Sequence, residues 1–369
     1  MNVLFDHQVF SFQEYGGISR YYSRLITTLS AGNDVQVDLL IKYSNNSFLT
    51  ELASLKPRSF FRSHKFKGRN EIIRILNQQY FRKEYYKRTQ PDIFHPTYYH
   101  PYFLESIGTV PFALTIYDMA HEMYPTMFHP MDFTIKNKRL LAAKASRIIA
   151  ISEHTKKDAV RILGVPESKI DVIPLATDLR VDFTEKNQAT IPEQFILYVG
   201  ARNTYKNFPF FLRSITPLIN DEKKLFVVCA GGGKFSTEEK KIINELSLSD
   251  KIIQMNVNDG ILALLYSKTK AMVYPSLYEG FGIPVLEAFT CGAPVVLSER
   301  SSLPEVGGDA AVYFDPEQDE SLLAAVRSVV HKQEIAREMV KKGLERAKLF
   351  SWGKTADATL ATYRKILHR

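Results

Sequence analysis

The chain has 369 residues, of which 45% are hydrophobic and 24% charged, and a formal net charge of +8. It is too long for one ordinary core, so two domains are expected, with the composition of a soluble globular protein. No run of about eighteen apolar residues is present, which excludes a membrane-spanning helix, and the N-terminus MNVLFDHQVF lacks the features of a signal peptide.

The first half of the chain alternates short apolar runs with segments of helical periodicity. A strand over residues 2–5 precedes a loop through residues 6–17 and a helix over residues 18–30. Further strands are predicted over residues 35–41, 92–96, 111–118, 147–152 and 169–175. Ser152 is the expected N-cap of a helix that Gly164 ends.

The apolar pattern lapses after residue 176, and a linker is placed at residues 179–192. A second series begins there, with strands over residues 195–200, 224–233, 252–255, 271–276 and 293–298, and helices over 208–219, 236–248, 261–269 and from Pro284. Strands that alternate with helices in both halves predict an α/β protein with two doubly wound parallel-sheet domains. Ligands of such domains sit beyond the carboxyl ends of the strands.

The stretch LYEGFGIPVLEAFTCGAP, residues 277–294, joins one of these strands to a helix. Gly280 and Gly282 allow a sharp turn and close approach of a ligand to main-chain N–H groups. Pro284 suits the first helical position, and the free N–H groups there can bind an anion such as a phosphate. The carboxylates of Glu279 and Glu287 can accept hydrogen bonds from sugar hydroxyls. Glu287 is also explained as a first-turn acid that complements the helix dipole.

A second cluster, YVGARNTYKNF, follows the strand at residues 195–200. Gly200 permits close backbone approach, and the cations Arg202 and Lys206 can neutralise a diphosphate. The alternative is an exposed basic loop. The glycine run of VCAGGGK, residues 228–234, follows the next strand and is weak evidence by itself.

In the first half, the glycine pair at residues 16–17 lies between a strand and a helix and is a candidate phosphate cradle. Asp118 and His121 follow one strand, and His95 and His100 follow another, although a lone histidine is more often structural. The chain has no G-x-G-x-x-G, Asp-x-Asp, H-E-x-x-H or G-x-S-x-G motif, which argues against dinucleotide binding, metal dependence and acyl-serine chemistry.

Residues 56–88 carry eleven Lys or Arg against two Glu, and seven aromatic residues are interspersed among them. Such a segment suits either the anionic surface of a membrane or nucleic acid, and no nucleic-acid motif accompanies it. The alternative is a solvated helical face whose aromatic side chains lie in the core. Cys229 and Cys291 lie in apolar contexts, so buried reduced thiols and a cytoplasmic location are expected.

Together these segments resemble the retaining glycosyltransferases of the GT4 family, over nearly the whole chain. EGFGIPVLEA matches the E-x7-E motif of that family, VGARNTYKN its Gly-Arg…Lys-Asn segment and FQEYGGISRYYSRL its first glycine loop. The resemblance implies the GT-B fold, two Rossmann-like doubly wound parallel-sheet domains that face a cleft. Residues 1–178, with a C-terminal helix at 352–369, would form the acceptor-binding domain, and residues 193–351 the nucleotide-sugar donor domain.

The resemblance also implies roles for individual residues. Arg202 and Lys206 would hold the diphosphate and stabilise the departing charge, and Glu279 would grip the donor sugar. Further donor contacts are implied for Gly17, Asp118, Gly200, Asn207, Val257, Gly280, Phe281, Gly282, Ile283 and Glu287. Glu287 would bind the ribose, and Val257 would lie at the base. Many relatives carry a His-Asp pair where this chain has Tyr117-Asp118, so either Asp118 or His121 would contact the sugar, His121 from the other domain.

The implied activity is retaining, metal-independent hexosyl transfer without a cofactor. A donor similar to GDP-mannose is favoured, with UDP-sugars next, and the acceptor would be a saccharide or lipid-linked oligosaccharide of surface polysaccharide synthesis (O-antigen, capsule or exopolysaccharide). The expected location is the cytoplasm, at the inner face of the membrane, with residues 56–88 on the anionic surface and no nucleic acid as partner. The alternatives are a nucleotide-sugar epimerase or hydrolase of the same fold, or a non-catalytic nucleotide-sugar-binding protein.

Overall fold

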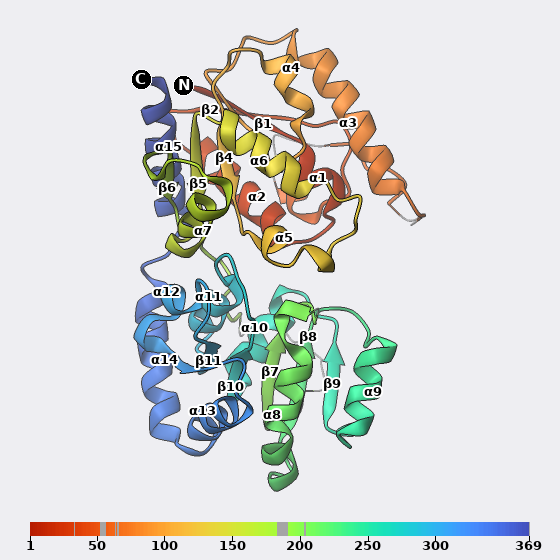
Figure 1. Cartoon of the computed structure of the whole chain (residues 1–369), viewed down its shortest axis with the longest axis vertical. Helices are drawn as coiled ribbons and strands as arrows, with labels where there is room; N and C mark the ends of the chain where they lie inside the picture. The colour runs from red at the N-terminus through yellow and green to blue at the C-terminus, as the bar shows by residue number, and fades with distance from the viewer. Residues whose placement is uncertain are drawn as a thin grey trace. The chain divides into compact units, whose positions relative to one another are not determined.

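The structure is a computed structural model that describes residues 1–32, 34–51, 57–62, 64, 66–182, 191–202 and 204–368. The chain divides into two compact units, one of Met1–Leu175 with Trp352–Arg369 and one of Ala176–Ser351 (Figure 1). Most of the predicted linker, residues 183–190, lies outside the described residues. The flanking linker residues that are described form no helix or strand.

The first unit is built on parallel strands. They are β1 (Asn2–Asp6), β2 (Gln36–Leu40), β3 (Ile93–His95), β4 (Ala113–Ile116), β5 (Arg147–Ala150) and β6 (Ile170–Val172). The strand orders are β2-β1-β3 and β4-β5-β6, and a parallel bridge between Phe94 and Phe112 joins the two groups. The order therefore reverses direction between β1 and β3. In an open α/β sheet this reversal is the topological switch point, where ligands bind beyond the strand ends.

Helices connect these strands: α1 (Gln8–Phe12), α2 (Gly17–Ser30), α3 (Arg69–Tyr85), α4 (Leu104–Ile107), α5 (Ala120–Met123), α6 (Thr134–Lys144) and α7 (Glu153–Leu163). Short 3-10 turns lie at η1 (Ser47–Glu51), η2 (Pro101–Phe103), η3 (Pro125–Met127) and η4 (Glu167–Lys169). The prediction for α7 is confirmed, because Ser152 Oγ accepts a hydrogen bond from the Thr155 N–H and Gly164 ends the helix at φ 68°. The uninterrupted loop predicted for residues 6–17 is wrong, because α1 forms there and packs on α3. Five residues are too few to show helical periodicity.

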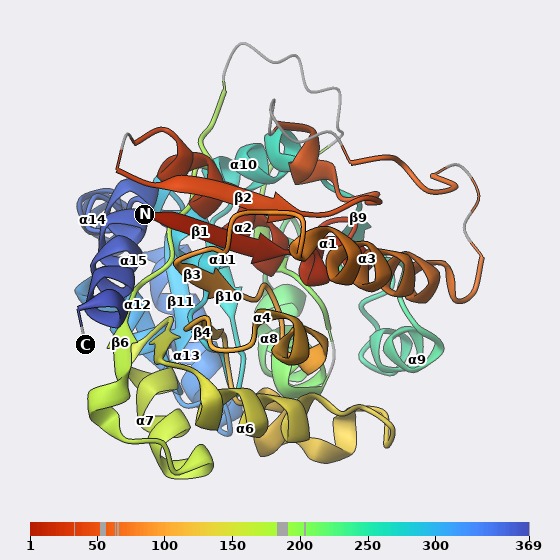
Figure 2. The same cartoon turned by 90° about the horizontal axis from the view of Figure 1, so that it is seen from above.

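The last helix, α15 (Trp352–Leu367), belongs to the first unit and packs on α2 and β5 (Figures 1 and 2). The Tyr363 hydroxyl lies 2.6 Å from His95 Nδ1, and Thr355 Oγ1 donates to the Pro174 carbonyl at 2.8 Å. Lys365 Nζ pairs with Asp171 at 2.7 Å. Residues from the two ends of the chain thus complete one buried core.

The second unit has one six-stranded parallel sheet in the order β12-β11-β10-β7-β8-β9. Its strands are β7 (Phe195–Val199), β8 (Phe226–Ala230), β9 (Ile252–Met255), β10 (Ala271–Tyr274), β11 (Val295–Ser298) and β12 (Val312–Phe314). All residues of the central strands β7 and β10 are buried, as expected for a sheet covered on both faces. The switch point of this sheet lies between β7 and β10.

Its helices are α8 (Phe208–Asp221), α9 (Thr237–Glu245), α10 (Asp259–Lys268), α11 (Ile283–Thr290), α12 (Leu303–Gly307), α13 (Asp319–His331) and α14 (Gln333–Ala347), with short turns η5 (Thr204–Lys206) and η6 (Gly308–Ala310). Helices α8, α9 and α13 bury apolar side chains against one face of the sheet. No helix was predicted for residues 319–347, where α13 and α14 lie. Cys229 and Cys291 are buried free thiols, as predicted, and burial raises the pKa of each to about 12.

Candidate functional site

Lys206 and Glu279 meet at the switch point of the second unit. Lys206 ends η5, which follows β7, and Glu279 lies in the loop that follows β10. The Lys206 Nζ and Glu279 Oε1 atoms are 2.5 Å apart, and the two side chains are 17% and 11% exposed. Lys206 Nζ also lies 3.4 Å from the Tyr274 hydroxyl. A cation and a carboxylate are therefore held together where two neighbouring strands end.

The loop that carries Glu279 is fixed through its backbone. Ser302 Oγ donates to the carbonyls of Glu279 and Phe281, at 2.9 and 3.0 Å, and Ser301 Oγ accepts from the Glu279 N–H at 2.9 Å. Gly282 has a φ of 101°, and a Cβ atom there would lie 2.9 Å from the Leu303 side chain. Only glycine fits this position without strain. The backbone of Glu279 is thus held by Ser301 and Ser302, while its carboxylate pairs with Lys206.

Helix α11 begins directly after this turn, with Gly282 as its N-cap and Ile283 and Pro284 in its first turn. Among the described residues, no side chain caps the start of this helix. Pro284 has no N–H group and the Val285 N–H donates to the Gly282 carbonyl at 2.9 Å, so it is mainly the positive end of the helix dipole that favours an anion at this position. Together with Lys206, the helix start supplies the positive potential that a bound diphosphate requires.

Glu287 is the fifth residue of α11, and its side chain is largely buried. The Tyr266 hydroxyl donates to Glu287 Oε2 at 3.2 Å. The first turn of the helix contains no acidic residue, so the interpretation of Glu287 as a first-turn acid that complements the dipole is wrong. The predicted contact of Glu287 with a ribose stays a prediction.

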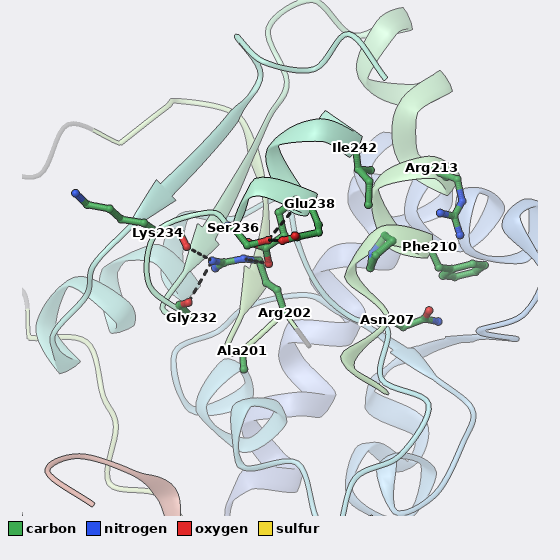
Figure 3. A pocket seen from close by; sticks show the side chains of 12 residues that line it. Ala201, Arg202, Asn207, Phe210, Arg213, Gly232, Lys234, Ser236, Glu238 and Ile242 are labelled. Carbon is green, nitrogen blue, oxygen red and sulfur yellow. Dashed lines mark hydrogen bonds and ion pairs between the residues drawn. The ribbon is translucent and has the colours of Figure 1, made fainter. Parts of the chain in front are cut away.

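Arg202 occupies a different environment from Lys206. Its side chain is 2% exposed, and its Nε atom donates to Glu239 Oε1 at 2.8 Å. Nη1 donates to the Gly231 carbonyl at 2.9 Å, and Nη2 lies within hydrogen-bond distance of the carbonyls of Gly232, Gly233 and Lys234, at 2.8–3.3 Å. Figure 3 shows the guanidinium pointing at this glycine turn. All three guanidinium nitrogens are therefore engaged, which does not support the predicted diphosphate contact.

The turn that Arg202 holds, residues 231–234, joins β8 to α9 and has three glycines with positive φ. A Cβ atom on Gly232 would lie 2.5 Å from Arg202 Nη1 and 2.7 Å from the Gly200 carbonyl. The guanidinium carbon lies 4.8 Å from the centroid of the Phe235 ring. A pocket of about 630 Å³ opens beside it between α8 and α9 (Figure 3). The glycine run, which is weak evidence as a sequence motif, thus supplies the backbone carbonyls that surround the Arg202 guanidinium.

The remaining predicted donor residues of the second unit lie around the same strand ends. Asn207 is the left-handed N-cap of α8, and its Nδ2 donates to the Pro316 carbonyl at 2.9 Å. Gly200 follows β7 with a φ of 109°, and Val257 lies between β9 and α10. Gly280 and Phe281 are buried in the loop before α11. Their contacts with a donor stay predictions.

In the first unit, His121 and Asp118 lie on and before α5. His121 Nε2 lies 3.3 Å from Asp132 Oδ2, and its ring stacks on Phe128 at a centroid distance of 3.7 Å. Asp118 Oδ1 accepts a hydrogen bond at 2.9 Å from the N–H of Ala120, the first residue of α5. Gly17 is the first residue of α2. The predicted donor contacts of Gly17, Asp118 and His121 stay predictions.

A buried ion pair that the sequence analysis missed supports the segment around His121. Lys138 and Glu122 are 1% and 4% exposed, and their charged atoms lie 2.9 Å apart. Lys138 Nζ also donates to the Asp118 carbonyl at 2.9 Å. The sequence does carry a signal for this pair. Lys138 follows Thr134 and precedes Leu141 at helical spacing, which places it on the buried face of α6.

His95 and His100, the other predicted strand-end histidines, have structural partners. His95 is fully buried between Tyr363 and Thr115, and burial lowers its pKa to about 3. His100 Nδ1 accepts from the Tyr102 N–H at 3.1 Å and caps η2. Within the described residues, no three His, Cys, Asp or Glu side chains are placed to hold a metal ion. None of the described helices is both long and apolar enough to cross a bilayer.

Comparison with known families matches both halves of the chain. Residues 15–181 match the family Glycosyltransferase Family 4, and residues 182–346 match Glycosyl transferases group 1. O-antigen chain mannosyltransferase B of Escherichia coli is 25% identical over 95% of this chain and 96% of its own length. O-antigen chain mannosyltransferase RfbU of Salmonella typhimurium is 28% identical over 59% of this chain and 60% of its own length.

Solved structures share the fold at low sequence identity. Sucrose-phosphate synthase from Thermosynechococcus elongatus superposes with a TM-score of 0.79 and 19% identity, over 100% of this chain and 99% of that one. HepE from Anabaena, in complex with UDP and glucose, superposes with a TM-score of 0.74 and 14% identity, over 98% and 99% of the two chains. The likeness extends over both units, each with its own parallel sheet.

Proposed function

The chain is a glycosyltransferase of the GT-B fold, and we propose that it transfers a hexose from a nucleotide diphosphate sugar to a saccharide acceptor. The donor is a GDP-mannose-like sugar ahead of a UDP-sugar, because relatives from Escherichia coli and Salmonella typhimurium are named as mannosyltransferases. The acceptor is a saccharide or lipid-linked oligosaccharide of surface polysaccharide synthesis, as the names of the O-antigen relatives suggest.

The observation that carries this proposal is the Lys206–Glu279 pair at the β7/β10 switch point, beside the uncapped start of α11. Cleavage of a glycosyl–phosphate bond builds negative charge on the diphosphate and positive character on the sugar carbon. Lys206, which its pair with Glu279 holds at this position, and the positive end of the α11 dipole stabilise the first charge. This charge is the one that a metal ion would otherwise neutralise, so we propose metal-independent transfer.

Glu279 and Glu287 then act as hydrogen-bonding groups, at the donor sugar and at the ribose. Neither is assigned as a nucleophile. We propose that retention of configuration follows from same-face attack, in which a diphosphate oxygen of the leaving group takes the proton of the acceptor hydroxyl. Glu279 accepts hydrogen bonds from sugar hydroxyls in this scheme, while Lys206 remains on the phosphate side.

The test combines a donor screen with a transfer assay. We expect a GDP-, UDP- or ADP-sugar to raise the Tm of the protein, and radiolabelled hexose to appear in a saccharide product. Lys206→Ala removes one preorganised cation and is expected to lower kcat by about 10²–10³-fold. Lys241→Ala is the matched control, because Lys241 is 76% exposed on α9. Release of free sugar without transfer would indicate a hydrolase, and near-normal transfer by Lys206→Ala would contradict the site.

We also propose that part of residues 56–88 contacts an anionic membrane surface. Phe61, Phe66, Ile72 and Ile75 are exposed by 40–61%, with Arg62 and Lys67 among them. Exposed apolar side chains mixed with cations suit insertion between anionic headgroups. Lys56, Ser63 and Lys65 lie outside the described residues.

Other parts of this segment are structural. Phe81 and Tyr85 are buried on α3, and Arg69 is buried and pairs with Glu14. Vesicle co-sedimentation tests the surface role, with phosphatidylglycerol-containing vesicles compared with neutral ones. Neutralising Lys67, Arg82 and Lys83 together is expected to weaken binding to the anionic vesicles only. Unchanged binding would leave a solvated helical face as the better explanation.

A further inference from the structure

A buried tyrosine adjoins the candidate site of the second unit. Tyr274 is the last residue of β10, at the strand end beside the switch point, and it is 4% exposed. Its ring adjoins the turn before α11, where a Cβ atom on Gly282 would lie 3.9 Å from Tyr274 Cε1. The Lys206 Nζ atom lies 5.5 Å from the centroid of this ring, within the range of a cation–π contact. Tyr274 is thus next to both the glycine turn and the cation of the site.

The Tyr274 hydroxyl is a third member of the Lys206–Glu279 pair. It lies 3.4 Å from Lys206 Nζ, and it donates a hydrogen bond to the Glu279 carboxylate. Burial raises the pKa of Tyr274 well above its ordinary value, and the charge of Glu279 and this hydrogen bond raise it further, so the hydroxyl keeps its proton. A phenol can donate and accept at the same time. The hydroxyl can therefore serve the carboxylate as donor and the ammonium as acceptor.

A bound diphosphate would change the partners of Lys206. The ammonium has three N–H donors, and phosphate oxygens compete with the Glu279 carboxylate for them. That carboxylate is 11% exposed, so water replaces a withdrawn hydrogen bond only in part, and a buried acceptor without a donor is unfavourable. The Tyr274 hydroxyl stays within reach of Glu279, because its ring is buried at the end of the strand. The carboxylate therefore keeps one donor when Lys206 turns to the phosphates.

We propose that Tyr274 is a positioning residue for the transfer reaction, whose hydroxyl holds the Glu279 carboxylate at the donor sugar while Lys206 serves the diphosphate. This inference rests on the proposed function and deepens it, because it assigns to a buried tyrosine the separation of the two members of the pair. The contacts of Ser301 and Ser302 cannot replace this hydroxyl, since they hold the backbone of the loop and not the carboxylate.

The first measurement compares nucleotide-sugars with the same nucleotides without the sugar. Titration calorimetry with GDP and UDP gives the Kd of the nucleoside diphosphate, and initial rates with GDP-mannose and UDP-glucose give kcat/KM for the donor. The wild type is expected to use at least one of these donors. Tyr274→Phe removes the hydroxyl and keeps the ring. It should lower the donor kcat/KM by about tenfold or more, as the loss of one hydrogen bond to a charged group does, and leave the diphosphate Kd within about twofold. Lys206→Ala should impair both.

The second measurement is a double-mutant cycle with Glu279→Ala, at temperatures well below the Tm of each variant. If the hydroxyl acts through the carboxylate, Tyr274→Phe should lower kcat by less than about threefold in the Glu279→Ala protein. A merely structural tyrosine would cause the same fold-loss in both backgrounds. Tyr313→Phe is the matched control, because this tyrosine lies on the edge strand β12 of the same sheet and its hydroxyl donates to the Gly308 carbonyl at 2.7 Å. It should leave kcat unchanged.

The inference is overturned if Tyr274→Phe retains the wild-type kcat/KM, if it weakens GDP or UDP binding as much as it lowers kcat/KM, or if its effect is the same with and without Glu279. An equal loss in Tyr313→Phe would also overturn it. Hydrolysis of the donor in place of transfer, with the same coupling of Tyr274 and Glu279, would overturn the proposed transfer and leave the role of Tyr274 standing. Normal transfer by the wild type with additive effects of the two substitutions would overturn the role of Tyr274 alone. A wild type that binds no nucleotide-sugar would overturn both.

Discussion

Replacing Arg202 by lysine separates a role in holding the glycine turn from a role in binding a diphosphate. The arginine donates hydrogen bonds to Glu239 and to four backbone carbonyls, whereas a lysine ammonium has only three N–H donors. At least two of these partly buried acceptors therefore lose their partner. Hydrogen bonds that involve a charged group contribute about 1.5–3 kcal/mol each, so Arg202→Lys should lower the free energy of unfolding by about 3 kcal/mol or more.

For a domain the size of the second unit, about 3 kcal/mol corresponds to a Tm decrease of about 6–12 °C. Differential scanning calorimetry with and without donor measures this decrease. Arg213→Lys is the matched control, because Arg213 is exposed and lines the same pocket from α8. A surface substitution of this kind should change stability by less than about 0.5 kcal/mol.

The two possible roles of Arg202 predict different changes in the Tm and in the donor-induced Tm shift. A residue that holds the turn loses thermal stability on substitution, and the donor-induced Tm shift of the variant remains measurable. A phosphate ligand instead loses donor affinity at unchanged thermal stability. The second pattern, with an unchanged Tm for Arg202→Lys, would refute the reasoning from the hydrogen bonds of the guanidinium.

Three further predictions concern other charged and buried groups. Glu279→Ala should lower kcat by about 10²-fold or more and should also lower the Tm, because it leaves the Lys206 ammonium without its carboxylate although Ser301 and Ser302 still hold the backbone of the loop; an unchanged Tm in calorimetry would contradict this. Lys138→Met leaves the buried Glu122 carboxylate without its partner and should lower the free energy of unfolding, measured in urea, by about 3–5 kcal/mol. Adding Glu122→Gln should restore part of this free energy in the double variant. His95 has a folded pKa of about 3, below its unfolded value near 6.5, so its contribution to stability falls as pH decreases from about 6.5 towards 3, by up to about 1.4 kcal/mol per pH unit. Between pH 7 and pH 5, the free energy of unfolding in urea should decrease less for His95→Gln than for the wild type. An equal decrease would contradict a neutral buried His95.

Local patterns in the sequence predicted the sheet architecture and the loop of Glu279 because both depend on neighbouring residues. Alternating apolar runs and helical periods identify strands and helices, and a glycine before a proline identifies the start of α11. The environment of Arg202 could not be predicted in this way. Its partners lie 29–37 residues away in the sequence, and only the pairing of β7 with β8 brings them together.

The same limit applies to Lys138. The buried partner of Lys138 comes from another helix, and a charged residue on an apolar face indicates that a partner exists without identifying it. For Glu287 the error was one of register. The helix starts at Ile283, so the glutamate lies one turn further in than a first-turn position and faces Tyr266. Helix boundaries are the part of a pattern that sequence defines least well.

The position of α15 also affects the order in which the protein folds during synthesis. The His95 side chain, the Tyr21 ring and the Asp171 carboxylate all contact side chains of α15. Emergence from the ribosome normally lets the N-terminal domain fold first. Here the second unit leaves the ribosome whole before the first unit has its last helix. We therefore expect the first unit, although it is synthesised earliest, to reach its native core last, with residues of β3 and α2 exposed to chaperones until then.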